Sequence, residues 1–156
     1  MDLPAADKHA GLPEYTDIVP VSLLVLVNAM IPVPGETPGD WWGNTGWEPA
    51  RVVAAQAGGY PAEVDLDTYF LHDVPADVVA TGEGHNFPEA EIAFAQPCAM
   101  KRWPDVSTRV LAGRDDRFFP LEFQRRVARD RLGIAAEAVP GVTWRRWPIR
   151  PNSPTS

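Results

Sequence analysis

The residues best placed to do chemistry are two neighbouring acids, Asp115 and Asp116, which follow the apolar run 108–113 and precede Pro120. A carboxylate at the carboxyl end of a strand can accept the N–H of an imidazole, fix its tautomer and stabilise the imidazolium formed during proton transfer. The same carboxylate, a few residues ahead of a helix, can instead cap the start of that helix. The local sequence leaves both roles of Asp116 open.

Few other side chains offer acid–base, nucleophilic or metal chemistry. The histidines are His9, His72 and His85, and the one thiol is Cys98. Because no zinc-ligand spacing links them, the sequence predicts no metal site and no cofactor. His72 or His85 could act as a general base if its segment folds over Asp116, since a base must lie within hydrogen-bond reach. Cys98 has neither a flanking elbow nor an obvious base, so it is a weak candidate nucleophile.

Three apolar segments predict the strands that would position these residues. Residues 22–31 form a continuous aliphatic run closed by Pro32, which is typical of a strand buried on both faces of a parallel sheet; a buried helix is the alternative. Residues 108–113 and 136–140 predict a second and a third strand. A strand, a long excursion, a strand, a helix and a strand imply parallel pairing through right-handed crossovers, hence an α/β sheet.

The segments between these strands predict one long helix, two short helices and much loop. Residues 121–132 place their apolar side chains on one face, which predicts an amphipathic helix. Good helix formers at 51–57 and 75–80 predict two shorter helices. Residues 32–44 have turn-forming types at nearly every step and are expected to form a loop, and residues 83–105 are also expected to be irregular.

Three sequence segments follow one another in an order that is informative about the fold. They are Leu-Val-Leu-Val-Asn-Ala-Met-Ile-Pro, then a stretch rich in Pro, Gly and Trp, and then Thr-Arg-Val-Leu-Ala-Gly-Arg-Asp-Asp-Arg-Phe-Phe-Pro before a helix. Over about residues 11–141 this order resembles the C-terminal half of the α/β-hydrolase superfamily, and in particular its small bacterial esterase-like members. In that family a strand ends in Gly-x-x-Asp-x-x-x-Pro, whose acid orients the catalytic histidine. Gly113, Asp116 and Pro120 match this pattern, so the resemblance implies that Asp116 is the triad acid and that the substrate is a carboxylic ester or similar acyl compound.

The resemblance also implies a fold and a division of the chain. The expected fold is a partial α/β-hydrolase domain, with a small parallel sheet, a loop-rich lid and an amphipathic helix. It would cover residues 21–141, with the lid at about 32–105. We expect residues 1–20 to form a loose lead-in and residues 142–156 to form a disordered tail.

The other catalytic groups of the family are missing from this sequence. The family places its nucleophile in Gly-x-Ser-x-Gly at a strained turn. None of the serines has glycines at that spacing; they are Ser22, Ser107, Ser153 and Ser156. We therefore expect an internal deletion between about residues 19 and 22, and a chain that is inactive as a serine hydrolase. The alternative is a non-catalytic remnant or interaction protein that associates through an exposed sheet edge.

The C-terminal sequence departs from the family where its catalytic histidine is expected. No histidine follows Gly141, but regrouping a plausible set of codons from that residue gives Gly-His-Leu-Ala-Ala-Leu-Ala-His-Pro-Ala-Glu-Leu. This peptide is similar to the family's histidine turn and final helix. The hypothesis is a one-base loss near the Gly141 codon, with a divergent tail as the alternative. The coding DNA distinguishes the two.

Two apolar features complete the predictions from the resemblance. Five aromatic residues would either line a lid over an acyl pocket or pack against the sheet; they are Trp41, Trp42, Trp47, Tyr69 and Phe70. Loss of the strand that normally neighbours residues 23–30 would leave an apolar edge with unpaired backbone groups, which favours self-association.

Composition limits the partners. The 156 residues carry a formal charge of −7, which argues against binding to nucleic acid or to anionic membranes. Residues 1–100 are strongly acidic and residues 101–156 are basic, so we expect contact between the two regions within one domain. The single Cys98 and the absence of a long apolar run or a signal-like start favour a cytoplasmic location.

Overall fold

A computed structural model describes residues 21–82 and 92–141, and residues 1–20, 83–91 and 142–156 lie outside this description. The predicted lead-in and tail, with the proposed histidine turn, therefore fall on residues that the structure does not describe.

The centre of the fold is a three-stranded parallel sheet in the order β1-β2-β3. Its strands are β1 (Leu23–Val27), β2 (Ser107–Gly113) and β3 (Ala136–Val139). The register pairs Leu23 with Ser107 and Val110 with Ala136. The predicted parallel α/β arrangement is confirmed at this level.

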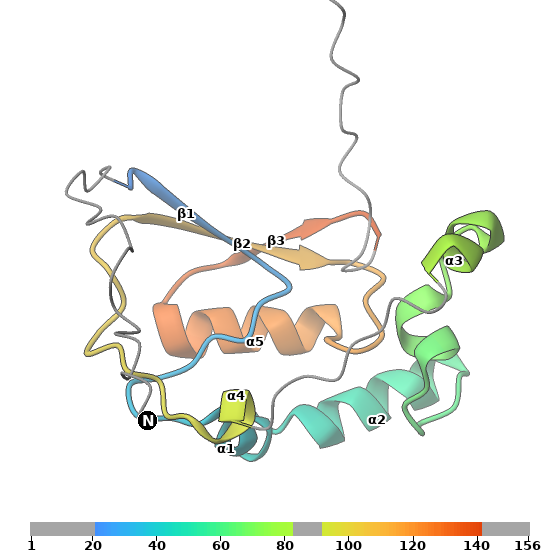
Figure 1. The fold of residues 1–156 in the computed structure, drawn as a ribbon, viewed down its shortest axis with the longest axis horizontal. Coiled ribbons are helices and arrows are strands. Elements are labelled where there is room, and N and C mark those ends of the chain that lie inside the picture. The colour runs from blue at the N-terminus through green and yellow to red at the C-terminus, as the bar shows by residue number, and fades with distance from the viewer. Residues whose placement is uncertain (1–20, 83–91, 142–156) are drawn as a thin grey trace, which may run out of the picture.

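The helix α5 (Leu121–Leu132) connects β2 to β3 and agrees with the predicted amphipathic helix. It packs Phe123, Val127 and Ala128 against Val110 of β2, and all four are buried. The C-cap residue Gly133 adopts a left-handed conformation with φ 69°, which ends the helix. Figure 1 shows α5 beneath the sheet, with further helices on the same side.

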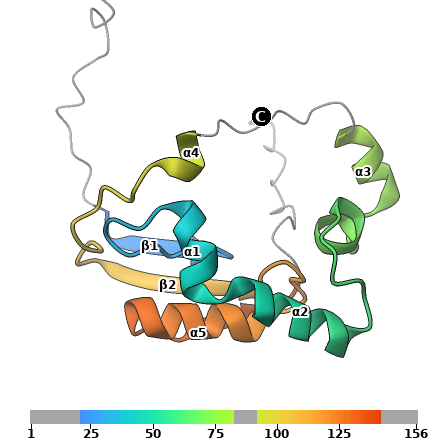
Figure 2. The same ribbon diagram turned by 90° about the horizontal axis from the view of Figure 1, so that it is seen from below.

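About half of the described residues between β1 and β2 are helical, which is more helix than the two short helices predicted there. The segment contains α1 (Pro38–Thr45), α2 (Trp47–Gly58), the π-helix η1 (Asp67–Leu71), α3 (Ala76–Gly82) and α4 (Ile92–Ala95). Helices α2 and α3 agree with the two predicted short helices. Helix α4 falls in a region expected to be irregular. Figure 2 shows α1 and α2 beside the sheet and α5, with α3 farther out.

Helix α1 overturns the prediction that residues 32–44 form only a loop. The Thr37 side chain accepts the backbone N–H of Asp40 at 3.0 Å, and Pro38 occupies the first turn, where its missing N–H costs nothing. Gly46 ends the helix with φ 63°, a left-handed conformation that glycine tolerates. A capping residue, a proline and a closing glycine thus define a helix in a sequence that we took for turns alone.

The first strand is shorter than expected and is not buried on both faces. It ends before Asn28, whose φ of 42° is incompatible with a strand. Leu26 packs against the core, whereas Leu23, Val25 and Val27 on the other face are 47%, 42% and 50% exposed. Within the described ranges, no helix or strand covers this second face of the sheet (Figure 1).

The predicted contact between the acidic and basic parts of the chain is confirmed by a buried ion pair. Glu36, which follows β1, pairs with Arg131 near the end of α5, and their side chains are 2% and 11% exposed. The second guanidinium nitrogen of Arg131 lies 2.9 Å from Oε1 of Glu36, and Asn44 donates to the same oxygen at 2.9 Å. These bonds lower the pKa of Glu36 from 4.5 to about 2, the Arg131 hydrogen bond being the main cause.

Candidate functional site

The candidate site lies at the carboxyl edge of the sheet, where the three strands converge. The Oδ1 atom of Asn28 accepts the backbone N–H of Gly113 at 2.6 Å, which joins the end of β1 to the end of β2. The N–H of Arg114 donates to the carbonyl of Val139 at 2.8 Å and joins β2 to β3. A Cβ at Gly113 would lie 2.8 Å from the carbonyl oxygen of Gly141, so this position requires glycine.

Asp116 lies in the turn that leaves β2 and is 5% exposed. Its Oδ1 accepts the backbone N–H groups of Phe118 at 2.9 Å and Phe119 at 2.8 Å. These bonds hold the turn ahead of α5 and do not cap the helix itself. The N-cap residue of α5 is Pro120, and no side chain caps the helix there. The role of triad acid stays a prediction.

A cavity of about 420 Å³ opens beside this turn. His72, which directly follows η1, and Tyr60, which follows α2, line it together with Asp116. Its other lining residues include Ala54, Gly58, Arg114, Asp115, Arg117, Pro120 and Leu121. The segment between β1 and β2 therefore brings His72 to the cavity of Asp116, the arrangement on which its role as a base depended.

The Nδ1 atom of His72 is buried and has no hydrogen-bond partner among the described residues. A buried ring nitrogen without a partner costs free energy relative to one that is hydrogen-bonded. The other histidines, His9 and His85, lie outside the described residues.

Charged groups around the cavity are largely paired with one another. Arg114 lies 3.2 Å from Asp115, and Gly141 donates its N–H to the same carboxylate at 3.1 Å. The Arg114 hydrogen bond, followed by that of Gly141, lowers the pKa of Asp115. Arg117 stacks 4.6 Å from the centre of the Tyr60 ring, and burial raises the pKa of that phenol. The cavity therefore offers a mixed polar lining with both signs of charge.

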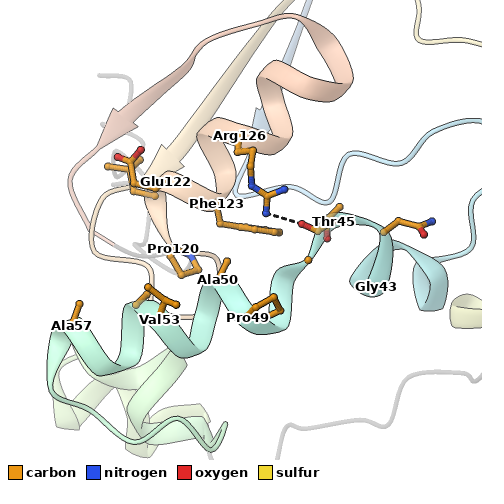
Figure 3. A pocket seen from close by; sticks show the side chains of 14 residues that line it. Gly43, Thr45, Pro49, Ala50, Val53, Ala57, Pro120, Glu122, Phe123 and Arg126 are labelled. Carbon is orange, nitrogen blue, oxygen red and sulfur yellow. Dashed lines mark hydrogen bonds between the residues drawn. The ribbon is translucent and has the colours of Figure 1, made fainter.

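An apolar groove of about 1070 Å³ adjoins the polar cavity. It runs between α2, which contributes Ala50, Val53 and Ala57, and α5, whose Phe123 lies near Ala50 (Figure 3). Arg126 of α5 also lines the groove, and its guanidinium donates to the carbonyl of Thr45 at the end of α1. Three residues line both hollows: Ala54, Pro120 and Leu121. The two spaces are therefore neighbours with a common wall.

The described serines lie at the opposite edge of the sheet. Ser107 begins β2, and Ser22 immediately precedes its register partner Leu23. A strand rises about 3.3 Å per residue, so the six steps from Ser107 to Gly113 place both hydroxyls roughly 20 Å from the carboxyl edge. Ser153 and Ser156 fall outside the described residues. Cys98 lies in a separate cavity, with Glu36 and Trp41.

The aromatic residues fill the core, as one of the two alternatives predicted. Trp41 is 1% exposed and makes edge-on contacts with Phe119 and Phe123 at ring distances of 5.6 and 5.8 Å. Tyr69 is equally buried, and Arg51 donates to its hydroxyl at 2.9 Å. Trp42 contacts Trp47 edge-on, and Trp47 and Phe70 make tilted ring contacts with Phe118.

Sequence reasoning missed two residues of the site, Asn28 and Tyr60. Asn28 is the polar end of an aliphatic run, and its left-handed backbone is a conformation that asparagine adopts more readily than most residues, which could have marked the strand end. Tyr60 follows two glycines and is polar only at its tip. Its place in the cavity depends on how α2 packs, which local sequence does not specify.

Comparison with known proteins gives no match: no family model matches the sequence, and neither does any curated protein or solved structure. In the part of the chain that the structure describes, no helix has the length and apolar character needed to cross a membrane. The same residues contain no group of three or more His, Cys, Asp or Glu side chains that could hold a metal ion.

Proposed function

We propose that the chain binds carboxylic esters or similar acyl compounds at the carboxyl edge of its sheet, in keeping with its resemblance to α/β-hydrolases. One observation carries the proposal: the polar cavity of Asp116 and His72 shares a wall with the apolar groove between α2 and α5. Open α/β sheets bind ligands outside the carboxyl ends of their strands, which is where both hollows meet.

The pair of hollows suits a molecule with one polar end and one apolar end. An ester carbonyl in the smaller cavity would face His72 and the polar lining, and an alkyl or aryl part would extend past Leu121 along the groove. Ligand sites of about 300–1,000 Å³ with an apolar lining and a few convergent polar groups are typical of small-molecule binding.

Binding without an acyl-enzyme is the role that the residues favour. The family mechanism needs a nucleophile beside its histidine, and the sequence has no Gly-x-Ser-x-Gly. Ser22 and Ser107 lie at the far edge of the sheet, which is too distant for attack on a carbonyl in the Asp116 cavity.

Direct hydrolysis by water is a second candidate, favoured by the position of His72 in the same cavity as Asp116. His72 would take a proton from water while the water oxygen bonds to the ester carbonyl carbon. The tetrahedral intermediate would then expel the alcohol oxygen, which takes the proton back from the imidazolium. Asp116 would act as a positioning residue in this scheme.

Binding of a non-hydrolysable alkyl ketone, followed by tryptophan fluorescence, tests the proposal. Leu121→Glu places a charge on the common wall and should weaken binding at least tenfold, which is ~1.4 kcal/mol. Ile92→Glu, on the exposed start of α4, is the matched control and should bind like the wild type. Equal affinity in both variants, or no binding by the wild type, would contradict the proposal.

Turnover of a short-chain nitrophenyl ester separates the two candidates. Hydrolysis that falls in both His72→Gln and Asp116→Asn supports catalysis by water. Binding of the ketone with no such hydrolysis supports a binding role alone.

A further inference from the structure

The strand β1 forms one edge of the sheet, and no described residue pairs with the backbone groups on its outer side. The N–H of Asn28 donates to Leu111 of β2 at 3.0 Å. Successive residues of a strand direct their backbone groups to opposite sides, so Leu24 and Leu26 also face β2. The N–H and C=O groups of Leu23, Val25 and Val27 therefore point away from the sheet, where no described strand lies.

The same three residues also carry the exposed apolar side chains of β1. Leu23, Val25 and Val27 are between 42% and 50% exposed on the uncovered face of the sheet. Proteins usually guard such an edge with lysine, proline or an inward charge. Residues 23–27 contain none of these, and no charged residue occurs anywhere in the stretch 18–35.

We propose that β1 pairs with β1 of a second copy of this chain, antiparallel and around a two-fold axis at Val25. This register places Leu23 opposite Val27 of the second copy and Val25 opposite its own equivalent. All three pairs bring outward backbone groups face to face, so each pair exchanges two hydrogen bonds. The result is a continuous six-stranded sheet, because the β1-β2-β3 sheet of one copy continues into that of the other.

Symmetry and charge both point to a second copy as the occupant. The sequence Leu-Leu-Val-Leu-Val is apolar throughout, so its reversal about Val25 sets apolar side chains opposite apolar side chains. A two-fold axis brings identical surfaces together, and the formal charge of −7 makes most such contacts repulsive. The uncharged β1 edge lets two copies approach without placing like charges opposite one another.

A shift of register by one residue is disfavoured by the backbone. Such a shift moves the axis to a point midway between Val25 and Leu24 or Leu26, and it opposes outward groups of one copy to groups of the other that already bond to β2. It would leave the outward groups of Val25 unpaired in a partly dry contact, which costs about 1–3 kcal/mol for each group.

The short edge implies a weak dimer. Stable interfaces bury about 800 Å² per partner, and five residues of strand edge offer less. We expect dissociation in the range of about 10 to 100 µM, well above the nanomolar affinities of larger interfaces.

Sedimentation velocity on the full chain tests the proposal from about 1 µM to about 1 mM, a range that spans the expected dissociation constant. The wild type should pass from monomer to dimer. Val25→Lys places two like charges at the axis and should raise the dissociation constant at least tenfold. The matched control Val78→Lys changes an equally apolar residue of similar exposure on α3 and should leave association unchanged. A wild type that stays monomeric at the highest concentration would overturn the proposal.

Disulfide trapping tests the register. In a Cys98→Ser background, Val25→Cys should form a covalent dimer on mild oxidation, because opposed residues of antiparallel strands have Cα atoms within disulfide range. Val78→Cys should cross-link far more slowly. A dimer that forms while Val25→Cys does not cross-link would refute the two-fold at Val25. Ligand binding at the carboxyl edge is measured separately, so the two proposals can fail independently.

Discussion

The two faces of the sheet have different surroundings, although β1 presents apolar side chains to both of them. On one face, Val110 and Ala112 of β2 lie buried under α5. On the other, Leu23, Val25 and Val27 of β1 remain about half exposed, next to the ion pair of Arg109 and Glu137. A strand sequence thus indicates how much apolar surface must be covered, but the partner that covers it is set by the rest of the fold.

Removal of a large core side chain on the covered side should have the largest effect. Trp41→Ala would leave a cavity beside Phe119 and Phe123 and would remove the hydrogen bond from the indole N–H to Ile31. We expect the free energy of unfolding to fall by about 3–5 kcal/mol, measured by urea denaturation. A loss below about 1 kcal/mol would show that the helical side is no better packed than the open face.

Disruption of the ion pair beneath the sheet should have the next largest effect, and this effect should depend on pH. Glu36 has a pKa of about 2 in the fold against 4.5 when unperturbed, so its contribution is complete above about pH 4.5 and is lost as pH falls towards 2. The shift corresponds to about 3 kcal/mol.

Glu36→Gln should therefore lower the free energy of unfolding by about 3 kcal/mol at pH 7. Denaturation of wild type and variant between pH 7 and pH 2 isolates this group from the other carboxylates. The difference between the two proteins should shrink with acid. A difference that stays constant with pH would contradict the assigned pKa.

A smaller effect is expected at the carboxyl edge, where two variants separate structure from function. Asp116→Ala removes the acceptor of the Phe118 and Phe119 N–H groups and should cost about 1–2 kcal/mol. Asp116→Asn keeps an Oδ1 acceptor, and its free energy of unfolding should lie close to that of the wild type. Thermal denaturation of the wild type and the two variants measures these differences in stability. Equal destabilisation by both would show that the negative charge, and not the turn geometry, matters most.

The smallest effect should come from the ion pair on the open face. Arg109 and Glu137 are 54% and 51% exposed, so water screens their attraction. Arg109→Ala should change the free energy of unfolding by about 0.5 kcal/mol or less. If Arg109→Ala lowered the free energy of unfolding as much as Glu36→Gln does, this face would have to be covered in solution. If a second copy covers it, the loss should then depend on protein concentration.

The predictions from sequence succeeded where local pattern determines the element. The spacing of Phe123 and Val127 defines α5, and the apolar runs define three strands whose order implies parallel pairing. They failed for α1, because its aromatic and glycine residues lower helix propensity and the Thr37 cap was overlooked. Asp116 was found at the end of β2 as expected, but its bonds to the following turn are local, and a pattern cannot separate such a role from catalysis.

Other parts of the site depend on contacts that no local pattern encodes. His72 reaches the Asp116 cavity because α2 and η1 place it there, 44 residues away in sequence. The exposure of Val25 results from which face the helices occupy. Because β1 is apolar on both of its faces, its sequence could not reveal which face is uncovered.

The crowding around Gly113 also indicates where this protein will accept remodelling. A methyl group there would press on the carbonyl of Gly141 and come within 3.1 Å of the Asn28 amide, so a single added carbon would disturb all three strand ends. The opposite end of β2 starts at the exposed Ser107 and has no such constraint. Grafted peptides or reporter groups should therefore be introduced at the amino end of the sheet.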